Sequence, residues 1–190
     1  MININGKWAL ITGASRGVGR ETAKFMAGRG CNLVLHSRQL AHTRDLEAEL
    51  LASGVQVFSV AADLANLSEV EEMLDAIEVQ GIALDIVLNN AGVQIAYRND
   101  FWKTPIEDFD VSFRINFLSI VTICYRVIPQ MIERGFGRVV NTTSGIRDEP
   151  EQAGYAASKA ALDKFTKDLS TAIEGTNVMM NLTDPGWCRT

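Results

Sequence analysis

Tyr155 and Lys159 are the side chains of this sequence best suited to moving a proton. They lie four residues apart in the segment Gly154–Leu162, so on a helix they share one face and bring a phenol beside an ammonium. A phenol is a weak acid near neutral pH, and a nearby cation stabilises its phenolate form. The pair predicts acid–base chemistry, although a Tyr and a Lys at this spacing also occur by chance on amphipathic helices.

Two other polar residues accompany the pair. Ser144 lies eleven residues before Tyr155, at the end of the apolar run Arg138–Thr143. It could simply cap a strand end, and Thr142 and Thr143 are rival hydroxyls. Asn116 interrupts the strongly apolar helical segment Arg114–Leu118, where an ordinary surface Asn is the plain alternative.

A glycine-rich segment closes the first strand of the chain. Gly13, Gly17 and Gly19 follow apolar residues and open a helical pattern, which is the context of a phosphate-binding loop. Glycines let the backbone approach a pyrophosphate, and exposed N–H groups with the helix dipole favour the anion. A Gly-rich turn without a ligand is the alternative. The predicted cofactor contacts here are Gly13, Ser15, Arg16, Gly17, Val18 and Gly19.

The end of the second strand predicts which dinucleotide binds. An acidic residue there would accept hydrogen bonds from the ribose 2′-hydroxyl of NAD and repel a 2′-phosphate, but this sequence has Ser37 and Arg38. Arg16 supplies a second guanidinium, whose forked donors suit a phosphate. The sequence therefore predicts NADP rather than NAD, unless both arginines are simply solvated.

Two more strand ends complete the predicted cleft. Asp63 and Leu64 end the third strand on the adenine side, although Asp63 could instead cap the helix that starts near Asn66. The segment Asn89–Gly92 ends the fourth strand, where Asn90, Ala91 and Gly92 would let a ribose pass close to the backbone.

Composition limits the class of protein. The 190 residues, 47% of them hydrophobic and 22% charged, fit one domain spanning residues 1–190. The formal charge of −5 and scattered cationic residues argue against a nucleic-acid partner. No signal-peptide pattern or apolar run of membrane-spanning length is seen, so we expect no membrane association.

Cysteine and histidine usage favours a reducing compartment and argues against a zinc site. Cys31, Cys124 and Cys188 are widely spaced and odd in number, which argues against a disulfide framework and predicts a reducing cytoplasm. The chain has two histidines and no Cys pairs, so a zinc site is not expected.

Short apolar runs alternate with amphipathic segments of helical length, as in a parallel sheet with helices on both faces. The predicted fold class is therefore α/β, a doubly wound Rossmann-type sheet in a single domain that binds ligands at the carboxyl ends of its strands. The predicted strands are Trp8–Ile11, Cys31–Leu35, Val55–Val60, Leu84–Leu88, Arg138–Asn141 and Asn177–Leu182. The predicted helices are 17–28, 40–53, 67–79, 108–134 and 153–174, with Pro129 expected to bend or weaken the last turn of the fourth.

Taken together, these motifs resemble the short-chain dehydrogenase/reductase family over nearly the whole chain. Besides the segments above, the likeness includes Pro129 and Met131 leading to Gly135 and Gly137, and the turn Pro185–Gly186. The resemblance implies an NADP-dependent oxidoreductase acting on a small carbonyl or alcohol substrate, and a homo-oligomer, dimer or tetramer.

The resemblance also implies roles for the site residues. Tyr155 would act as general acid or base and Ser144 would polarise the substrate oxygen, while Lys159 would hold the nicotinamide ribose. Asn116 would keep a helix bend and a water that relays protons toward Lys159. Pro185 and Gly186 would contact the nicotinamide carboxamide. The substrate pocket would be lined by Gln94, Ile95, Ile146, Arg147, Trp187 and Cys188.

The sequence departs from the family pattern in two places. The interval from Ser144 to Tyr155 is shorter than usual and highly charged. Family members usually continue past the Pro185–Gly186 turn with a lid, a helix and a seventh strand, so we expect a chain truncated at its C-terminus that lacks the last strand. Such a chain leaves open a catalytically impaired nucleotide-binding or interaction protein. An isomerase or lyase of the related extended group is disfavoured, because its Gly-x-x-Gly-x-x-Gly loop and acidic residue are missing.

Overall fold

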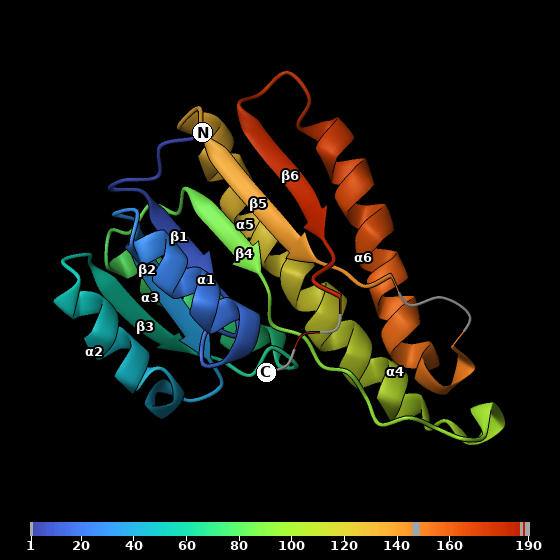
Figure 1. The fold of residues 1–190 in the computed structure, drawn as a ribbon. Helices are drawn as coiled ribbons and strands as arrows, with labels where there is room; N and C mark the ends of the chain where they lie inside the picture. The colour runs from blue at the N-terminus through green and yellow to red at the C-terminus, as the bar shows by residue number, and fades with distance from the viewer. Residues whose placement is uncertain (1, 146–148, 187, 189–190) are drawn as a thin grey trace.

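A computed structural model describes residues 2–145, 149–186 and 188 of the chain. Its centre is one six-stranded, all-parallel sheet in the order β3-β2-β1-β4-β5-β6 (Figure 1). The chain therefore winds outward from β1 in one direction and from β4 in the other, which confirms the predicted doubly wound α/β fold. The strands are β1 Trp8–Ile11, β2 Asn32–Ser37, β3 Val57–Ala61, β4 Ile86–Asn89, β5 Gly137–Thr142 and β6 Val178–Thr183.

The helices confirm the predicted pattern, with two differences. The predicted helix 40–53 is divided into a 3-10 turn and α2, and the predicted helix 108–134 starts at Ile106 and contains a π-helical turn. The main helices are α1 Gly17–Ala27, α2 Arg44–Ala52, α3 Leu67–Val79, α4 Ile106–Phe113, α5 Ser119–Glu133 and α6 Ala153–Ala172. The short turns are η1 Leu40–His42, η2 Phe101–Lys103, η3 Arg114–Leu118, which is the π-helical one, and η4 Pro150–Gln152.

Helices cover both faces of the sheet (Figure 1). Along β1, Ala9 and Ile11 point into the core shared with α1 and α2, while Leu10 points into the core shared with α3, α5 and α6. All three side chains are fully buried. A strand with both faces buried reads as a continuous apolar run rather than an alternating one, which explains the sequence of β1.

The continuous helix Ile106–Glu133 contains a long apolar stretch. The helix is 28 residues long, and an 18-residue window within it has a mean hydropathy of 1.5, which meets the length-and-composition test for a membrane span; 44% of that window is buried. The expectation that no apolar stretch reaches this length was therefore wrong. Seven residues of α5 are buried, among them Ile120, Cys124 and Met131 in the core, so packing accounts for much of this apolar character.

Pro129 does not end α5, which continues to Glu133. A proline leaves the carbonyl four residues earlier without its helical partner. That residue is Tyr125, which is 68% exposed, so water can hydrate the carbonyl.

The carboxyl ends of all six parallel strands meet at one edge of the sheet, and the turns after β1, β4, β5 and β6 carry most of the predicted site.

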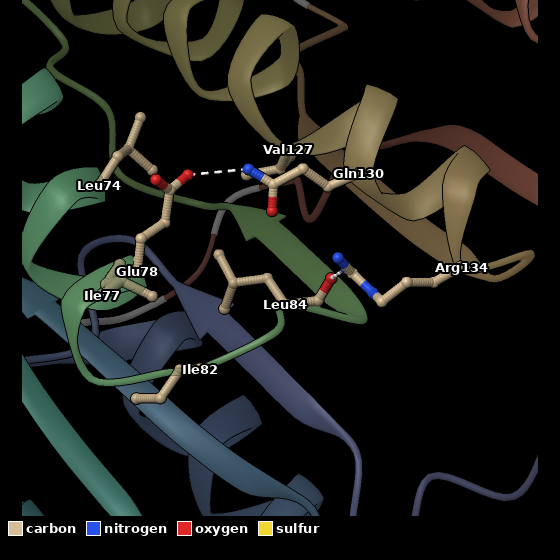
Figure 2. A pocket seen from close by; sticks show the side chains of 8 residues that line it. All are labelled: Leu74, Ile77, Glu78, Ile82, Leu84, Val127, Gln130 and Arg134. Atoms are coloured by element: carbon tan, nitrogen blue, oxygen red, sulfur yellow. Dashed lines mark hydrogen bonds between the residues drawn. The ribbon is translucent and has the colours of Figure 1, made fainter.

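A narrow hollow lies at the opposite edge, between the C-terminal ends of α3 and α5 (Figure 2). There Gln130 donates to Glu78 (2.8 Å) and Arg134 donates to the carbonyl of Leu84 (2.7 Å). None of the predicted site residues lines this hollow.

Candidate active site

Lys159 is a buried cation, only 4% exposed. It lies in the second turn of α6, and its Nζ donates to the carbonyl of Thr142, the last residue of β5, at 2.6 Å. Desolvation lowers the pKa of the Lys159 ammonium to about 8, and the nearby Asp163 carboxylate opposes this shift. The helix thus holds an ammonium at the carboxyl end of the sheet, where it can lose its proton close to physiological pH.

Tyr155 lies one turn earlier on α6 and is half-buried. The Nζ of Lys159 is 5.9 Å from the centroid of its ring, so the predicted pairing of phenol and ammonium on one face is confirmed. The hydroxyl of Ser158 donates to the backbone carbonyl of Tyr155 at 2.7 Å. That bond links the first turn of α6 to the neighbouring helix through Asn116.

Asn116 is fully buried in the π-helical turn η3. Its Oδ1 accepts from the N–H of Val93 at 2.8 Å, and its Nδ2 donates to the Val93 carbonyl at 2.9 Å and to Ser158 Oγ at 3.1 Å. The side chain therefore joins the segment after β4 to α6. The plain alternative of a surface Asn is wrong, because a wide helical turn aims this amide inward at backbone groups.

Gly92 shows how close these groups come to one another. A Cβ on Gly92 would lie 3.2 Å from Asn116 Oδ1 and 3.6 Å from Lys159 Nζ. The structure therefore brings together three predicted site residues from three separate segments of the chain.

Ser144 lies two residues beyond the end of β5 and is half-buried. Its rival Thr143 donates its hydroxyl to the Asp163 carboxylate, and Thr143 N–H donates to the Thr183 carbonyl at 2.8 Å. Thr143 is thus engaged with α6 and β6.

The glycine loop is fastened to the segment after β4. Asn90 Nδ2 donates to the carbonyls of Thr12 (2.9 Å) and Gly13 (3.3 Å). Gly13 has a positive φ of 69°, which favours glycine. A Cβ on Gly19 would lie 2.4 Å from the Gly13 carbonyl oxygen, so only glycine allows α1 to start this close to the loop.

The start of α1 fits an anionic group. No side chain caps its first turn at Arg16, and that turn has no acidic residue. By contrast, Asn66 caps α3 by accepting from the N–H of Ser68 at 3.1 Å. The N-terminal N–H groups of α1 are therefore suited to a phosphate. The arginines predicted to read the 2′-phosphate, Arg16 and Arg38, are both exposed.

The comparison with known proteins decides the family. The family model for short chain dehydrogenases matches residues 7–190. The chain belongs to the short-chain dehydrogenase/reductase family.

Relatives of known function support this membership. A 3-oxoacyl-[acyl-carrier-protein] reductase from Synechocystis is 31% identical over all of this chain and 77% of its own length. A D-beta-hydroxybutyrate dehydrogenase from Cupriavidus necator is 31% identical over 98% of this chain and 72% of its own length. Both names describe oxidoreductases.

Solved structures of the short-chain dehydrogenase/reductase family contain either cofactor. An NAD+-bound xylitol dehydrogenase has a TM-score of 0.89 and 30% identity, covering 98% of this chain and 72% of its own. A 3-oxoacyl-(acyl-carrier-protein) reductase from Agrobacterium tumefaciens with NADP bound has a TM-score of 0.87 and 28% identity, covering 95% and 69%. The chain is therefore an oxidoreductase of a family that uses nicotinamide cofactors.

The structure changes the interpretation of Asp63 and of Ser37. Asp63 does not cap α3, because Asn66 does; Asp63 Oδ1 instead accepts from Ala65 N–H at 3.0 Å. Ser37 is 3% exposed, and its hydroxyl donates to the Gln39 carbonyl at 2.8 Å, so the proton that a phosphate would need is already engaged. Of the remaining predicted contacts on the adenine side, Leu64 is buried.

The turn after β6 is tied to the serine loop. Asp184 accepts from the N–H of Gly145 at 2.7 Å and from the N–H of Gly186 at 2.9 Å. This carboxylate brings the neighbour of Ser144 beside the predicted Pro185–Gly186 contact. Among the predicted pocket residues, Gln94 and Cys188 are exposed and Ile95 is buried. Ile146, Arg147 and Trp187 lie outside the described residues.

The sequence analysis missed two residues that fasten this family site. Thr12 Oγ1 accepts from the N–H groups of Asn90 and Ala91, both at 3.0 Å, and Ser158 bridges Asn116 and Tyr155. Their position was a usable signal: Thr12 directly follows β1, and Ser158 lies one helical turn after Tyr155.

Burial of Lys159 predicts a pH-dependent cost to stability. Below pH 8 the ammonium is charged in both states, so the folded chain bears the full desolvation cost; the cost disappears as pH rises from about 8 toward the ordinary 10.5. We expect Lys159→Met to be more stable than the wild type by up to about 3 kcal/mol at pH 7, and this gap to close by pH 10. Urea unfolding at each pH measures it.

Lys164→Met is the matched control, since Lys164 lies on the same helix with a 73% exposed side chain. This substitution should leave the pH dependence of stability unchanged. A gap between Lys159→Met and the wild type that stays constant from pH 7 to 10 would contradict a lowered pKa of Lys159.

Proposed function

We propose that this chain is an NADP-dependent dehydrogenase/reductase that interconverts a small carbonyl compound and its alcohol. The observation that carries the proposal is the buried Lys159 ammonium beside Tyr155, at the sheet edge where the glycine loop begins α1. A site built only for structure gains little from a buried cation that is bonded to a neutral carbonyl at that edge. Family membership supports the reaction class.

Each protein group has a chemical task in this proposal. The bound nicotinamide supplies or accepts the hydride. Tyr155 donates its phenolic proton to the substrate oxygen during reduction and takes it back during oxidation. Ser144 donates a hydrogen bond to the same oxygen and favours the charge that develops there.

Lys159 and Asn116 support the phenol. The Lys159 ammonium favours the phenolate that remains after proton donation, and it is available to hold ribose hydroxyls near Gly92. Asn116 fixes the helix bend that brings these groups together, through its bonds to Val93 and Ser158.

The preference for NADP depends on charge. Arg16 and Arg38 are exposed at the rim of the glycine loop and beyond β2, and no acidic residue stands at the end of β2 to accept ribose hydroxyls. A guanidinium pairs with a 2′-phosphate through charge-assisted hydrogen bonds. These features favour NADP over NAD.

The assembly and the compartment belong to the same proposal. Phe165 on α6 makes edge-to-face ring contacts with Phe117 (5.9 Å) and Tyr125 (6.4 Å), and Tyr125 is largely exposed. We propose that this aromatic surface of α5 and α6 mediates a homo-oligomer.

Cys31 and Cys124 are free and buried, which supports a reducing compartment such as the cytoplasm.

The decisive experiment follows NADPH absorbance while the purified chain is supplied with a panel of aldehydes and ketones. Tyr155→Phe should bind NADPH as the wild type does but turn over about 10²–10⁴-fold more slowly, because the acid–base group is lost. Tyr125→Phe, which removes an exposed phenol from α5, is the control and should keep full activity. Tight NADPH binding by the wild type without turnover of any substrate would instead indicate a catalytically impaired nucleotide-binding protein.

Cofactor preference has its own test in Arg38→Asp. Replacing the guanidinium with a carboxylate should raise the KM for NADPH by about 10–100-fold, because a charge-assisted hydrogen bond becomes a repulsion, while NADH is improved or unaffected. Arg44→Asp, at the exposed start of α2, should change neither value. An Arg38→Asp enzyme with the wild-type ratio of KM values would refute a 2′-phosphate contact at Arg38.

A further inference from the structure

His36 occupies an unusual place for a histidine. It lies one residue before the end of β2 and is 2% exposed. Its Nδ1 is 3.2 Å from the backbone nitrogen of Gly13, and its Nε2 is 3.1 Å from the carbonyl oxygen of Ala62. The His36 carbonyl also accepts from the N–H of Ala14 at 2.9 Å. His36 therefore contacts the turns that follow β1 and β3, the two strands on either side of β2.

These partners fix the protonation state of the ring. Gly13 contributes a backbone N–H, so Nδ1 must be the bare acceptor nitrogen. Ala62 contributes a carbonyl, so Nε2 must carry the proton and donate it. The imidazole is therefore neutral and in a single tautomer, and burial lowers the pKa of His36, which favours that neutral form.

The ring joins the segments that the proposed cofactor site requires. Gly13 opens the glycine loop, Ala62 directly precedes Asp63 at the end of β3, and His36 itself precedes Ser37 and Arg38. Its two ring nitrogens therefore link the glycine loop directly to the end of β3. The imidazole thus adds a direct side-chain link between these segments to the strand pairing of β1, β2 and β3.

We propose that His36 is a positioning residue that holds the glycine loop at the distance from the β2 and β3 turns that a bound dinucleotide needs. The inference rests on the proposed cofactor site and deepens it. It assigns His36 no contact with substrate and no part in proton transfer. Its loss should therefore weaken cofactor binding and leave the chemical step intact.

The test compares three substitutions by NADPH fluorescence titration and steady-state kinetics. His36→Phe keeps a ring of similar size but removes both hydrogen bonds, so the Kd and the KM for NADPH should rise about tenfold while kcat at saturation stays close to wild type. His36→Asn retains an acceptor near the Nδ1 position and should stay within about threefold of the wild-type Kd. His36→Gln, whose longer side chain reaches toward Ala62, should bind about as weakly as His36→Phe.

His42→Phe is the control, since His42 is the other histidine of the chain and is exposed; it should bind NADPH normally. Thermal melting without cofactor checks folding, and if His36→Phe does not fold, the Asn and Gln variants carry the comparison. Equal Kd values for these two variants, or a folded His36→Phe that binds NADPH like the wild type, would overturn the inference. A wild-type chain that binds neither NADPH nor NADH would refute the proposed cofactor site itself.

Discussion

The site depends on keeping one ammonium out of water. A buried charge costs several kcal/mol unless it is well paired, and Lys159 is bonded to a neutral carbonyl at the end of β5 rather than to a carboxylate. The fold accepts this cost because α6 is anchored elsewhere, through Leu162 in the core and through the bond from Asn141 to Thr166. Tyr155, Asn116 and Gly92 are then arranged around the cation by elements that are distant in sequence. A buried ammonium lowers stability, so its presence at the carboxyl edge of the sheet, where ligands bind in such folds, favours a chemical role for Lys159 over a structural one.

The proposed cofactor end of the site has a different requirement, because the backbone N–H groups at the start of α1 must stay free to bind a ligand. The first turn of α1 lacks a side-chain cap and acidic residues, yet the loop before it is held on two sides. Asn90 and Thr12 fasten it to the segment after β4, and His36 fastens it to the segments after β2 and β3. A loop with this many backbone bonds pays little conformational entropy on binding an anion. The uncapped N–H groups and the fastened loop therefore suit the phosphate binding that we propose for this end of the sheet.

The sequence predicted the fold well because both of its signals were strong. Short apolar runs such as Trp8–Ile11 and Val139–Val140 favour strands of a parallel sheet, and glycines marked the helix ends. The proximity of the proposed catalytic pair was also predictable, because Tyr155 and Lys159 are local neighbours on one helix. What the sequence could not give was contact between distant segments: the amide of Asn116 reaching Val93, the hydroxyl of Thr143 turned to Asp163, and Asn66 taking the cap expected of Asp63. His36 was missed because its role appears only once β1, β2 and β3 lie side by side.

The account depends most on the buried state of the Lys159 ammonium in solution. NMR titration of lysine labelled with carbon-13 at the side-chain ε position, with the Lys159→Met chain to assign the resonance, measures this group directly. The account predicts one lysine that titrates near pH 8 and whose resonance is missing from the variant. A Lys159 resonance that titrates near the ordinary value of 10.5 would mean that the side chain is hydrated, and would contradict the arrangement around Tyr155 on which the proposed chemistry rests.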